Sequence, residues 1–205
     1  MLGKTHESFQ PFIDSVRAYV EQQRNDSNIV MPSFLAFDLR GHGQSTTIGN
    51  HEIHYADMGD TDFAKIPGDV AEMTNKVLSE YGIDTDRIVV VGASIGANAA
   101  MLLTEKMPFI SKVVMLSPGV DYRGLKPSEA FKEYKGQTLL VTGSRDRQSY
   151  VGSQQIAKGK MVDWLLKIYQ TAGHGTNLID ADPRAMHTVI QWIFTGEGGG
   201  FENAG

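Results

Sequence analysis

Residues 87–98, RIVVVGASIGAN, decide the fold of this chain. Four consecutive β-branched residues, 88–91, predict a buried strand, and the alanine-rich stretch that follows predicts a helix. Between them lies the pentapeptide 92–96, G-A-S-I-G, with Ser94 at its centre. We expect a very tight strand-to-helix turn that exposes the Ser94 hydroxyl. Both flanking positions hold glycine, where a Cβ would collide with the neighbouring strand or helix.

A serine in this position has the surroundings that a nucleophile needs. At the first turn of a helix it lies beside unpaired backbone N–H groups and the positive end of the helix dipole, which can stabilise an oxyanion. The spacing G-x-S-x-G alone is common, and the alternative is a tight turn whose serine only caps the helix. The strand before it, the helix after it and suitable partners later in the chain favour the nucleophile.

The composition is that of an ordinary globular domain. The 205 residues suffice for one substantial core, so we assign residues 1–195 to a single domain and the glycine-rich residues 196–205 to a flexible tail. Nineteen Lys and Arg against 24 Asp and Glu give a net charge of −5 without a basic cluster, so we expect no nucleic-acid partner. The absence of cysteine excludes disulfides, a thiolate nucleophile and cysteine-bound metals.

The sequence shows no sign of a membrane or secretory segment. The first residues lack the charged-then-apolar pattern of a signal peptide, and no apolar run approaches the ~18 to 20 residues of a membrane span. We therefore expect no membrane partner and a cytoplasmic protein.

Strand and helix patterns alternate along the whole chain. Apolar residues at helical spacing predict long helices, and short apolar runs bounded by turns predict strands. The predicted helices are 6–23, 66–81, 128–134, 150–160 and 183–194, besides the one after Ser94; the predicted strands are 33–39, 88–91, 112–116, 138–142 and 164–169. Residues 46–61 show no period and are expected to be irregular. This alternation predicts an α/β fold with a mainly parallel sheet flanked by helices.

Candidate catalytic side chains each follow a predicted strand. Ligands of parallel sheets bind at the carboxyl ends of the strands, so we expect Ser94, Asp146 and His174 to meet on one rim. A serine hydroxyl needs a base, and of the six histidines only His174 lies in a glycine-flanked loop directly after a late strand. Asp146 is the preferred acid to orient that base, with Asp121, after the preceding strand, as the alternative.

These motifs together resemble the α/β-hydrolase superfamily. The order Ser94, Asp146, His174 accompanies the segments D-L-R-G-H-G-Q-S, G-S-R-D and A-G-H-G, and the similarity covers about residues 33–194. Residues 82–100 are most similar to the dienelactone hydrolase and small carboxylesterase branches. The resemblance implies a serine hydrolase.

The resemblance also assigns supporting roles. It implies that the backbone N–H of Ile95 contributes to the oxyanion hole, and that Asp38 and Arg40 brace the loops of the site. Members of the superfamily begin with three further strands, and the third leads into a loop that supplies the second oxyanion N–H. This chain starts after them, so Met1 and Leu2 are the candidate donors; the alternative is a frayed terminus.

The missing strands predict a truncated, minimal α/β-hydrolase fold with an uncovered sheet edge. Such an edge invites association, so we expect a homodimer through it. No long insertion that could form a large lid is present, and only residues 46–66 could partly cover the site.

An open site favours small, soluble, short-acyl esters. The sequence thus predicts a serine carboxylesterase that works through a Ser-His-Asp triad and an acyl-enzyme, with no cofactor and no metal. The same machinery serves thioesterases, lactonases and peptidases, and another alternative is a catalytically impaired fold that acts as a binding or interaction module. A metal site at His51 and His54 is only weakly indicated.

Overall fold

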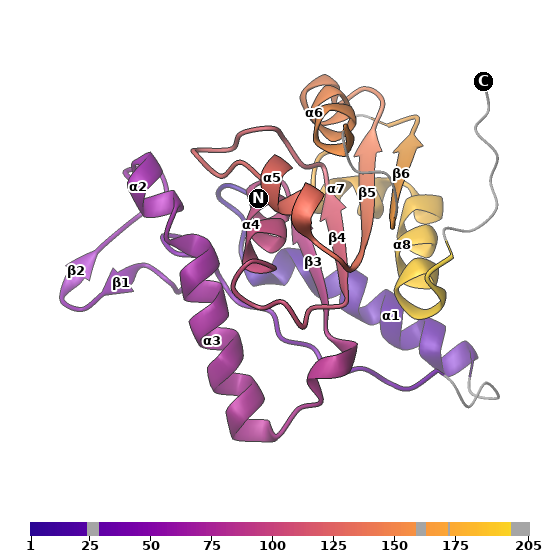
Figure 1. Cartoon of the computed structure of the whole chain (residues 1–205), viewed down its shortest axis with the longest axis horizontal. Coiled ribbons are helices and arrows are strands. Elements are labelled where there is room, and N and C mark those ends of the chain that lie inside the picture. The colour runs from indigo at the N-terminus through magenta and orange to yellow at the C-terminus, as the bar shows by residue number, and fades with distance from the viewer. Residues whose placement is uncertain (24–28, 159–162, 172, 198–205) are drawn as a thin grey trace.

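A four-stranded parallel sheet forms the centre of the molecule (Figure 1). The computed structural model describes residues 1–23, 29–158, 163–171 and 173–197. The strands lie in the order β3 (Val89–Ala93), β4 (Lys112–Leu116), β5 (Gln137–Gly143) and β6 (Trp164–Tyr169), and each neighbouring pair is parallel. The predicted α/β class is confirmed, and four of the five predicted strands are present.

Helices cover both faces of this sheet. One face holds α1 (Gln10–Gln22), which follows the 3-10 turn η1 (His6–Phe9), together with α7 (Thr176–Ala181) and α8 (Pro183–Thr195). The other face holds α3 (Ile66–Tyr81), α4 (Ile95–Leu103), α5 (Ser128–Glu133) and α6 (Arg147–Ala157). The short helix α7 lies in a segment for which the sequence predicted only a loop.

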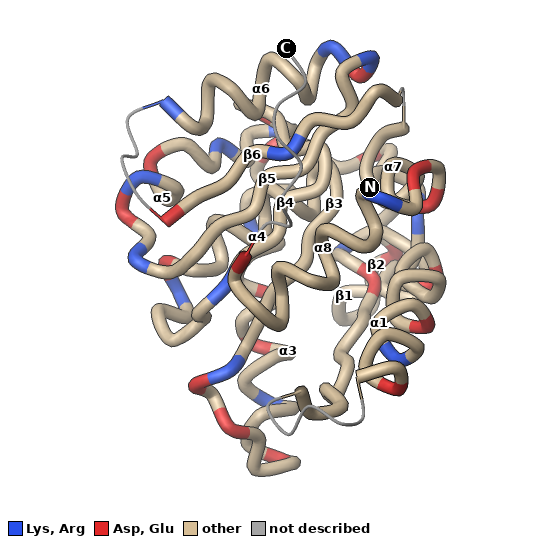
Figure 2. Tube along the Cα trace, turned by 90° about the vertical axis from the view of Figure 1, so that its right-hand side faces the viewer, with Lys and Arg blue, Asp and Glu red and all other residues tan. Residues whose placement is uncertain are grey.

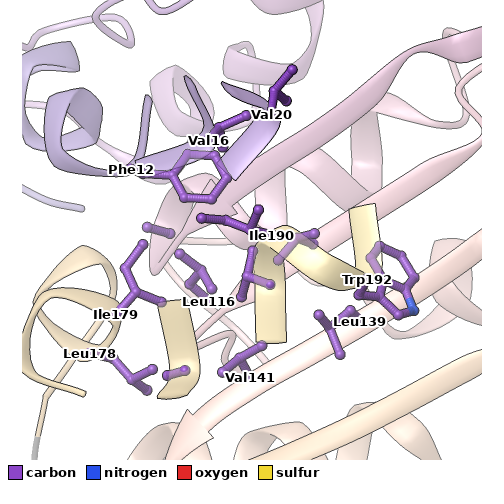
Figure 3. Packing of buried hydrophobic residues seen from close by; sticks show 14 residues of the cluster. Phe12, Val16, Val20, Leu116, Leu139, Val141, Leu178, Ile179, Ile190 and Trp192 are labelled. Carbon is purple, nitrogen blue, oxygen red and sulfur yellow. The ribbon is translucent and has the colours of Figure 1, made fainter. Parts of the chain in front are cut away.

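The core has two layers because strand side chains alternate in direction. In β4, Val114 and Leu116 pack with the α1 and α8 side, whereas Val113 and Met115 pack with the α4 and α5 side. Figure 3 shows the first layer, in which side chains of α1, α7 and α8 close over the strands. Burial on both faces explains why β4 reads as an uninterrupted apolar run after Lys112.

The prediction of a strand over residues 33–39 is wrong. Residues 29–39 form neither helix nor strand. A strand needs a neighbour to satisfy its backbone groups, and β3 pairs only with β4 in the described chain. Side chains hold this segment instead: Phe34 packs against the core, and Leu39 contacts the apolar cluster around Ile95.

The unpaired side of β3 is the open edge that the sequence predicted. Residues 89–91 are only half-buried, whereas Val113 to Leu116 in β4 are fully buried. The prediction that this edge joins two copies of the chain stays a prediction.

The excursion between residues 46 and 61 contains short elements. A hairpin of β1 (Thr47–Ile48) and β2 (His51–Glu52) precedes α2 (Asp60–Phe63). The helix α3 follows, and it ends at Gly82 in the left-handed conformation, as the sequence predicted. The apolar residues at helical spacing that predicted this helix include Met73 and Tyr81, but both side chains are exposed.

Charged residues lie mostly on the helices and connections around the sheet (Figure 2). Among the residues that the structure describes, no helix combines the length and apolar character needed to cross a bilayer. Most of the predicted tail, residues 198–205, lies outside the described residues.

Asp38 ties the loop after the extended segment to the N-terminal region. Its Oδ1 accepts a hydrogen bond from the His6 backbone N–H (2.7 Å) and faces His6 Nδ1 (3.0 Å), while Oδ2 accepts from the Gln44 N–H (2.8 Å). Burial alone would raise the pKa of Asp38, but the hydrogen bonds from Gln44 and His6 hold it below the ordinary value. The bracing role that the family resemblance implied for Asp38 is consistent with these contacts.

Asp38→Asn is expected to lower the free energy of unfolding at neutral pH by about 1–3 kcal/mol, because two backbone N–H groups lose a charged acceptor. Since the folded-state pKa of Asp38 is depressed, its stabilising effect is present above the ordinary carboxyl value of 3.8 and is lost as the pH falls below it. Urea unfolding at neutral and acidic pH should therefore show a difference that shrinks in acid. Asp14→Asn, with a carboxylate 60% exposed, is the control; equal effects of the two variants would contradict the prediction.

Candidate active site

Ser94 lies at the apex of a strained turn between β3 and α4. Its φ of 57° and ψ of −122° are rarely adopted by residues with side chains. The turn is held by the hydrogen bond from the Ser94 N–H to the Leu116 carbonyl (2.8 Å). A Cβ at Gly92 would lie 2.2 Å from the Gly96 carbonyl oxygen, so the backbones of strand and helix approach too closely for any side chain there.

The expectation that Gly96 also has no room for a Cβ is wrong. A Cβ at Gly96 would meet only Leu39 Cδ1, at 4.0 Å. The close contact is between Gly92 and the carbonyl of Gly96, whereas the Cβ position of Gly96 itself faces open space. One glycine of the pair is thus required by packing and the other is not.

Ser94, His174 and Asp146 form a continuous hydrogen-bonded run. The distance from Ser94 Oγ to His174 Nε2 is 2.8 Å, and that from His174 Nδ1 to Asp146 Oδ2 is 2.6 Å. Asp146 is the carboxylate next to the histidine, while Asp121 accepts the Gly124 N–H (2.8 Å) and faces Lys126. The structure therefore places the preferred acid, Asp146, against His174 and leaves the alternative acid, Asp121, in a separate turn.

Asp146 is positioned by its place at the start of a helix. It follows β5 and is the N-cap of α6, where its Oδ1 accepts the Ser149 backbone N–H at 3.4 Å. Its side chain is 12% exposed and that of His174 is 35% exposed. One carboxylate oxygen is thus fixed by the helix end, and the other is left for His174.

The loop that carries His174 is fastened to the end of β4. Ser117 is fully buried with a φ of 52°, and its N–H donates to the Val141 carbonyl (2.8 Å). Its Oγ accepts the Gly175 N–H at 2.9 Å. Ser117 therefore connects the strand next to the Ser94 elbow with the loop of His174.

Tyr122 and Ser149 complete the surroundings of the histidine. The Tyr122 ring meets the His174 ring edge-on, with centroids 6.4 Å apart, and its hydroxyl lies 3.2 Å from Ser149 Oγ. Burial raises the pKa of Tyr122, so this hydroxyl stays protonated at neutral pH. No role was predicted from the sequence for Tyr122, Ser149 or Ser117. The position of Ser117 directly after a strand was the available signal.

The three candidate oxyanion donors differ in their surroundings. Ile95 is the first residue of α4, and an N–H at this helix position has no acceptor within the helix. The Met1 nitrogen donates to the Ala93 carbonyl at 3.1 Å, directly beside the elbow, and burial together with the Lys4 charge lowers its pKa to about 6. Leu2 is 41% exposed. Their part in an oxyanion hole stays a prediction.

The segment expected to cover the site contacts the elbow through Ile95. The Ile95 side chain packs in a cluster with Met58, Phe63 and Leu125. Two hollows lie elsewhere: one is lined by His42, Tyr55 and neighbours, and the other lies between residues 37–48 and α3. Neither is lined by Ser94 or His174.

The other residues singled out in the sequence, Arg40, His51 and His54, form contacts of their own. Arg40 forms a two-pronged ion pair with Asp69 on α3, with Nε–Oδ2 and Nη2–Oδ1 distances of 2.7 and 2.5 Å. His54 pairs with Glu52 on the exposed hairpin, and His51 lies on the same hairpin. Within the described ranges, no group of three or more His, Cys, Asp or Glu residues is arranged to hold a metal ion.

The comparisons with known proteins agree with this arrangement. The model of a family described as "Serine aminopeptidase, S33" matches residues 32–142, more than half of the chain. The chain belongs to this family of α/β hydrolases. The α/β-hydrolase fold predicted from the elbow and its partners is thus confirmed.

The fold of this α/β hydrolase is similar to the folds of solved lipases and esterases. It is similar to the monoacylglycerol lipase of Paleococcus ferrophilus, with a TM-score of 0.66, 14% identity, and coverage of 96% of this chain and 92% of that one. A lipase-esterase related protein of Clostridium acetobutylicum is similar with a TM-score of 0.58 and 15% identity, over 89% of this chain and 87% of that one. An esterase of Pyrococcus furiosus is similar with a TM-score of 0.59 and 16% identity, over 80% of this chain and 68% of that one. No curated protein sequence matches the chain.

Proposed function

We propose that this α/β hydrolase is a serine carboxylesterase that acts on small, soluble, short-acyl esters through an acyl-enzyme. The observation that carries the proposal is the hydrogen-bonded run from Ser94 through His174 to Asp146, with Ser94 on a strained elbow. Nucleophile, base and orienting acid are within hydrogen-bond reach in the order that acyl transfer requires.

In the acylation step, Ser94 Oγ attacks the ester carbonyl carbon while its proton passes to His174 Nε2. The carbonyl π electrons move to oxygen, and the resulting oxyanion accepts the N–H of Ile95 and a second donor at Met1 or Leu2. The tetrahedral intermediate collapses by breaking the bond to the alcohol oxygen, which takes the proton from Nε2. Asp146 remains ionised and stabilises the imidazolium.

In the deacylation step, water takes the place of the alcohol. His174 Nε2 accepts a proton from water as its oxygen attacks the acyl carbon, and the bond to Ser94 Oγ then breaks. Nε2 returns the proton to Ser94, so the enzyme is regenerated and the carboxylic acid leaves. No cofactor enters this sequence of steps.

The choice of short-acyl esters rests on the shape of the chain around the elbow. Between β4 and β5 only the short helix α5 is inserted, and the cover at Ile95 comes from the segment around Met58 and Phe63 and from Leu125 in the β4–β5 connection. The family description names an aminopeptidase, and the same three side chains would serve amide hydrolysis. The experiment must therefore test two properties: the reactivity of Ser94, and the preference for esters over aminoacyl amides.

A fluorophosphonate probe is expected to label Ser94 covalently, because only an activated serine displaces its fluoride. Mass spectrometry of the digested protein should locate the adduct on the peptide that carries Ser94. Turnover of p-nitrophenyl acetate, butyrate and octanoate should fall as the acyl chain lengthens, and an aminoacyl p-nitroanilide should be hydrolysed more slowly than any of them. A folded protein that neither reacts with the probe nor hydrolyses any ester would instead favour the binding-module alternative.

A further inference from the structure

The buried face of α6 carries a hydroxyl that the proposed mechanism does not use. Ser149 is fully buried, and its Oγ lies 3.3 Å from His174 Nδ1, 3.2 Å from the Tyr122 hydroxyl and 3.4 Å from the Ser117 carbonyl oxygen. Its backbone N–H donates to Asp146, one turn earlier on the chain. Ser149 therefore contacts both members of the histidine–carboxylate pair.

The direction of these hydrogen bonds follows from the tautomer that acyl transfer needs. If Nε2 is to accept the proton of Ser94, Nδ1 must carry a hydrogen, which it donates to Asp146 at 2.6 Å. Ser149 Oγ can then only accept from Nδ1–H, and it donates its own hydrogen to the Ser117 carbonyl. The Tyr122 hydroxyl lies within hydrogen-bond distance of both Ser149 Oγ (3.2 Å) and the Ser117 carbonyl oxygen (3.5 Å) and completes this group of contacts.

We infer that Ser149 is a positioning residue, the second acceptor for His174 Nδ1–H beside Asp146. The inference rests on the proposed function. Because α6 fixes Ser149 and two further groups orient its hydroxyl, its oxygen dipole points at Nδ1 without reorganisation when the ring becomes positively charged. Ser149 thus holds the ring orientation and stabilises the imidazolium that each proton transfer creates.

Ser149→Ala is expected to lower kcat for a short-acyl ester by about threefold to tenfold, with KM nearly unchanged, since the lost hydrogen bond matters most in the charged transition state. The acid limb of the kcat/KM profile should move to lower pH because the imidazolium loses an acceptor. The charged and titratable groups around the ring are Asp146, the neutral Tyr122 and the Met1 amine, which donates to the Ala93 carbonyl beside Ser94, and the variant leaves all three in place. Ser149→Thr, which restores a hydroxyl, should recover most of the lost kcat.

The matched control is Ser153→Ala. Ser153 lies one turn further along α6, is equally buried, and its Oγ has no hydrogen-bond partner within the described chain. This variant should leave kcat, KM and the pH profile unchanged. A Ser149→Ala protein with lowered thermal stability but wild-type kcat and pH profile would overturn the inference.

A spectroscopic measurement separates this inference from the proposed function. In histidine-labelled protein, the proton resonance of His174 Nδ1–H should shift in Ser149→Ala and not in Ser153→Ala, whether or not any ester is hydrolysed. A wild-type protein without esterase activity would contradict the proposed function alone. An Nδ1–H resonance unchanged by Ser149→Ala would contradict the role of Ser149 alone.

Discussion

Ser94→Ala is expected to lower kcat/KM for p-nitrophenyl acetate by about 10⁴-fold to 10⁶-fold. Alanine removes the hydroxyl that forms the acyl-enzyme in the proposed mechanism, and the members of such a unit do not compensate for one another. Among the described residues the hydroxyl makes one hydrogen bond, to His174 Nε2, so its loss should change the free energy of unfolding by no more than about 1 kcal/mol. Steady-state kinetics and urea unfolding of the same preparation measure both effects.

The control for this prediction is again Ser153→Ala, a buried serine hydroxyl away from His174. Residual hydrolysis by Ser94→Ala at more than about a hundredth of the wild-type rate would show that another group performs the attack. It would leave the α/β-hydrolase family membership untouched, since that rests on the match over residues 32–142.

The sequence predicts the centre of this molecule well because local and long-range requirements agree there. The apolar runs of β4 and β6 are strands at the predicted residues, and Asp146 and His174 follow their strands as expected. Parallel pairing then brings the carboxyl ends together without further information. The geometry of Ser94, Asp146 and His174 could thus be anticipated from topology and order alone.

Predictions from the sequence fail where the local structure depends on contacts between segments that are distant in the chain. Residues 33–39 have a strand-like sequence, yet they pair with no strand of the described chain, so composition cannot decide their structure. Ser149 lies in an ordinary polar stretch and Ser117 directly follows an apolar strand, and only the crossing of α6, β4 and the His174 loop brings both hydroxyls to that loop. No spacing rule in the sequence encodes that crossing.

The two glycines of the elbow show most clearly how the sequence motif and the structure differ. The motif treats Gly92 and Gly96 alike, but a Cβ at Gly92 would lie 2.2 Å from a backbone oxygen, whereas a Cβ at Gly96 meets nothing closer than 4.0 Å. The clash at Gly92 is with backbone, which cannot rotate away as a side chain can. The substitution must therefore separate β3 from α4 and move Ser94 away from His174.

Gly92→Ala is expected to lower the free energy of unfolding by about 3 kcal/mol or more and to abolish measurable esterase activity even in the fraction that stays folded. Gly96→Ala, the matched control, should be neutral or stabilising by up to about 1 kcal/mol, because alanine is the better helix former and α4 has room for the methyl group. Urea unfolding and fluorophosphonate labelling of the two variants measure stability and nucleophile geometry separately. If both variants lost stability equally, the elbow would need two glycines for reasons of backbone conformation, and the one-sided contact between Gly92 and the Gly96 carbonyl would not be what limits the turn.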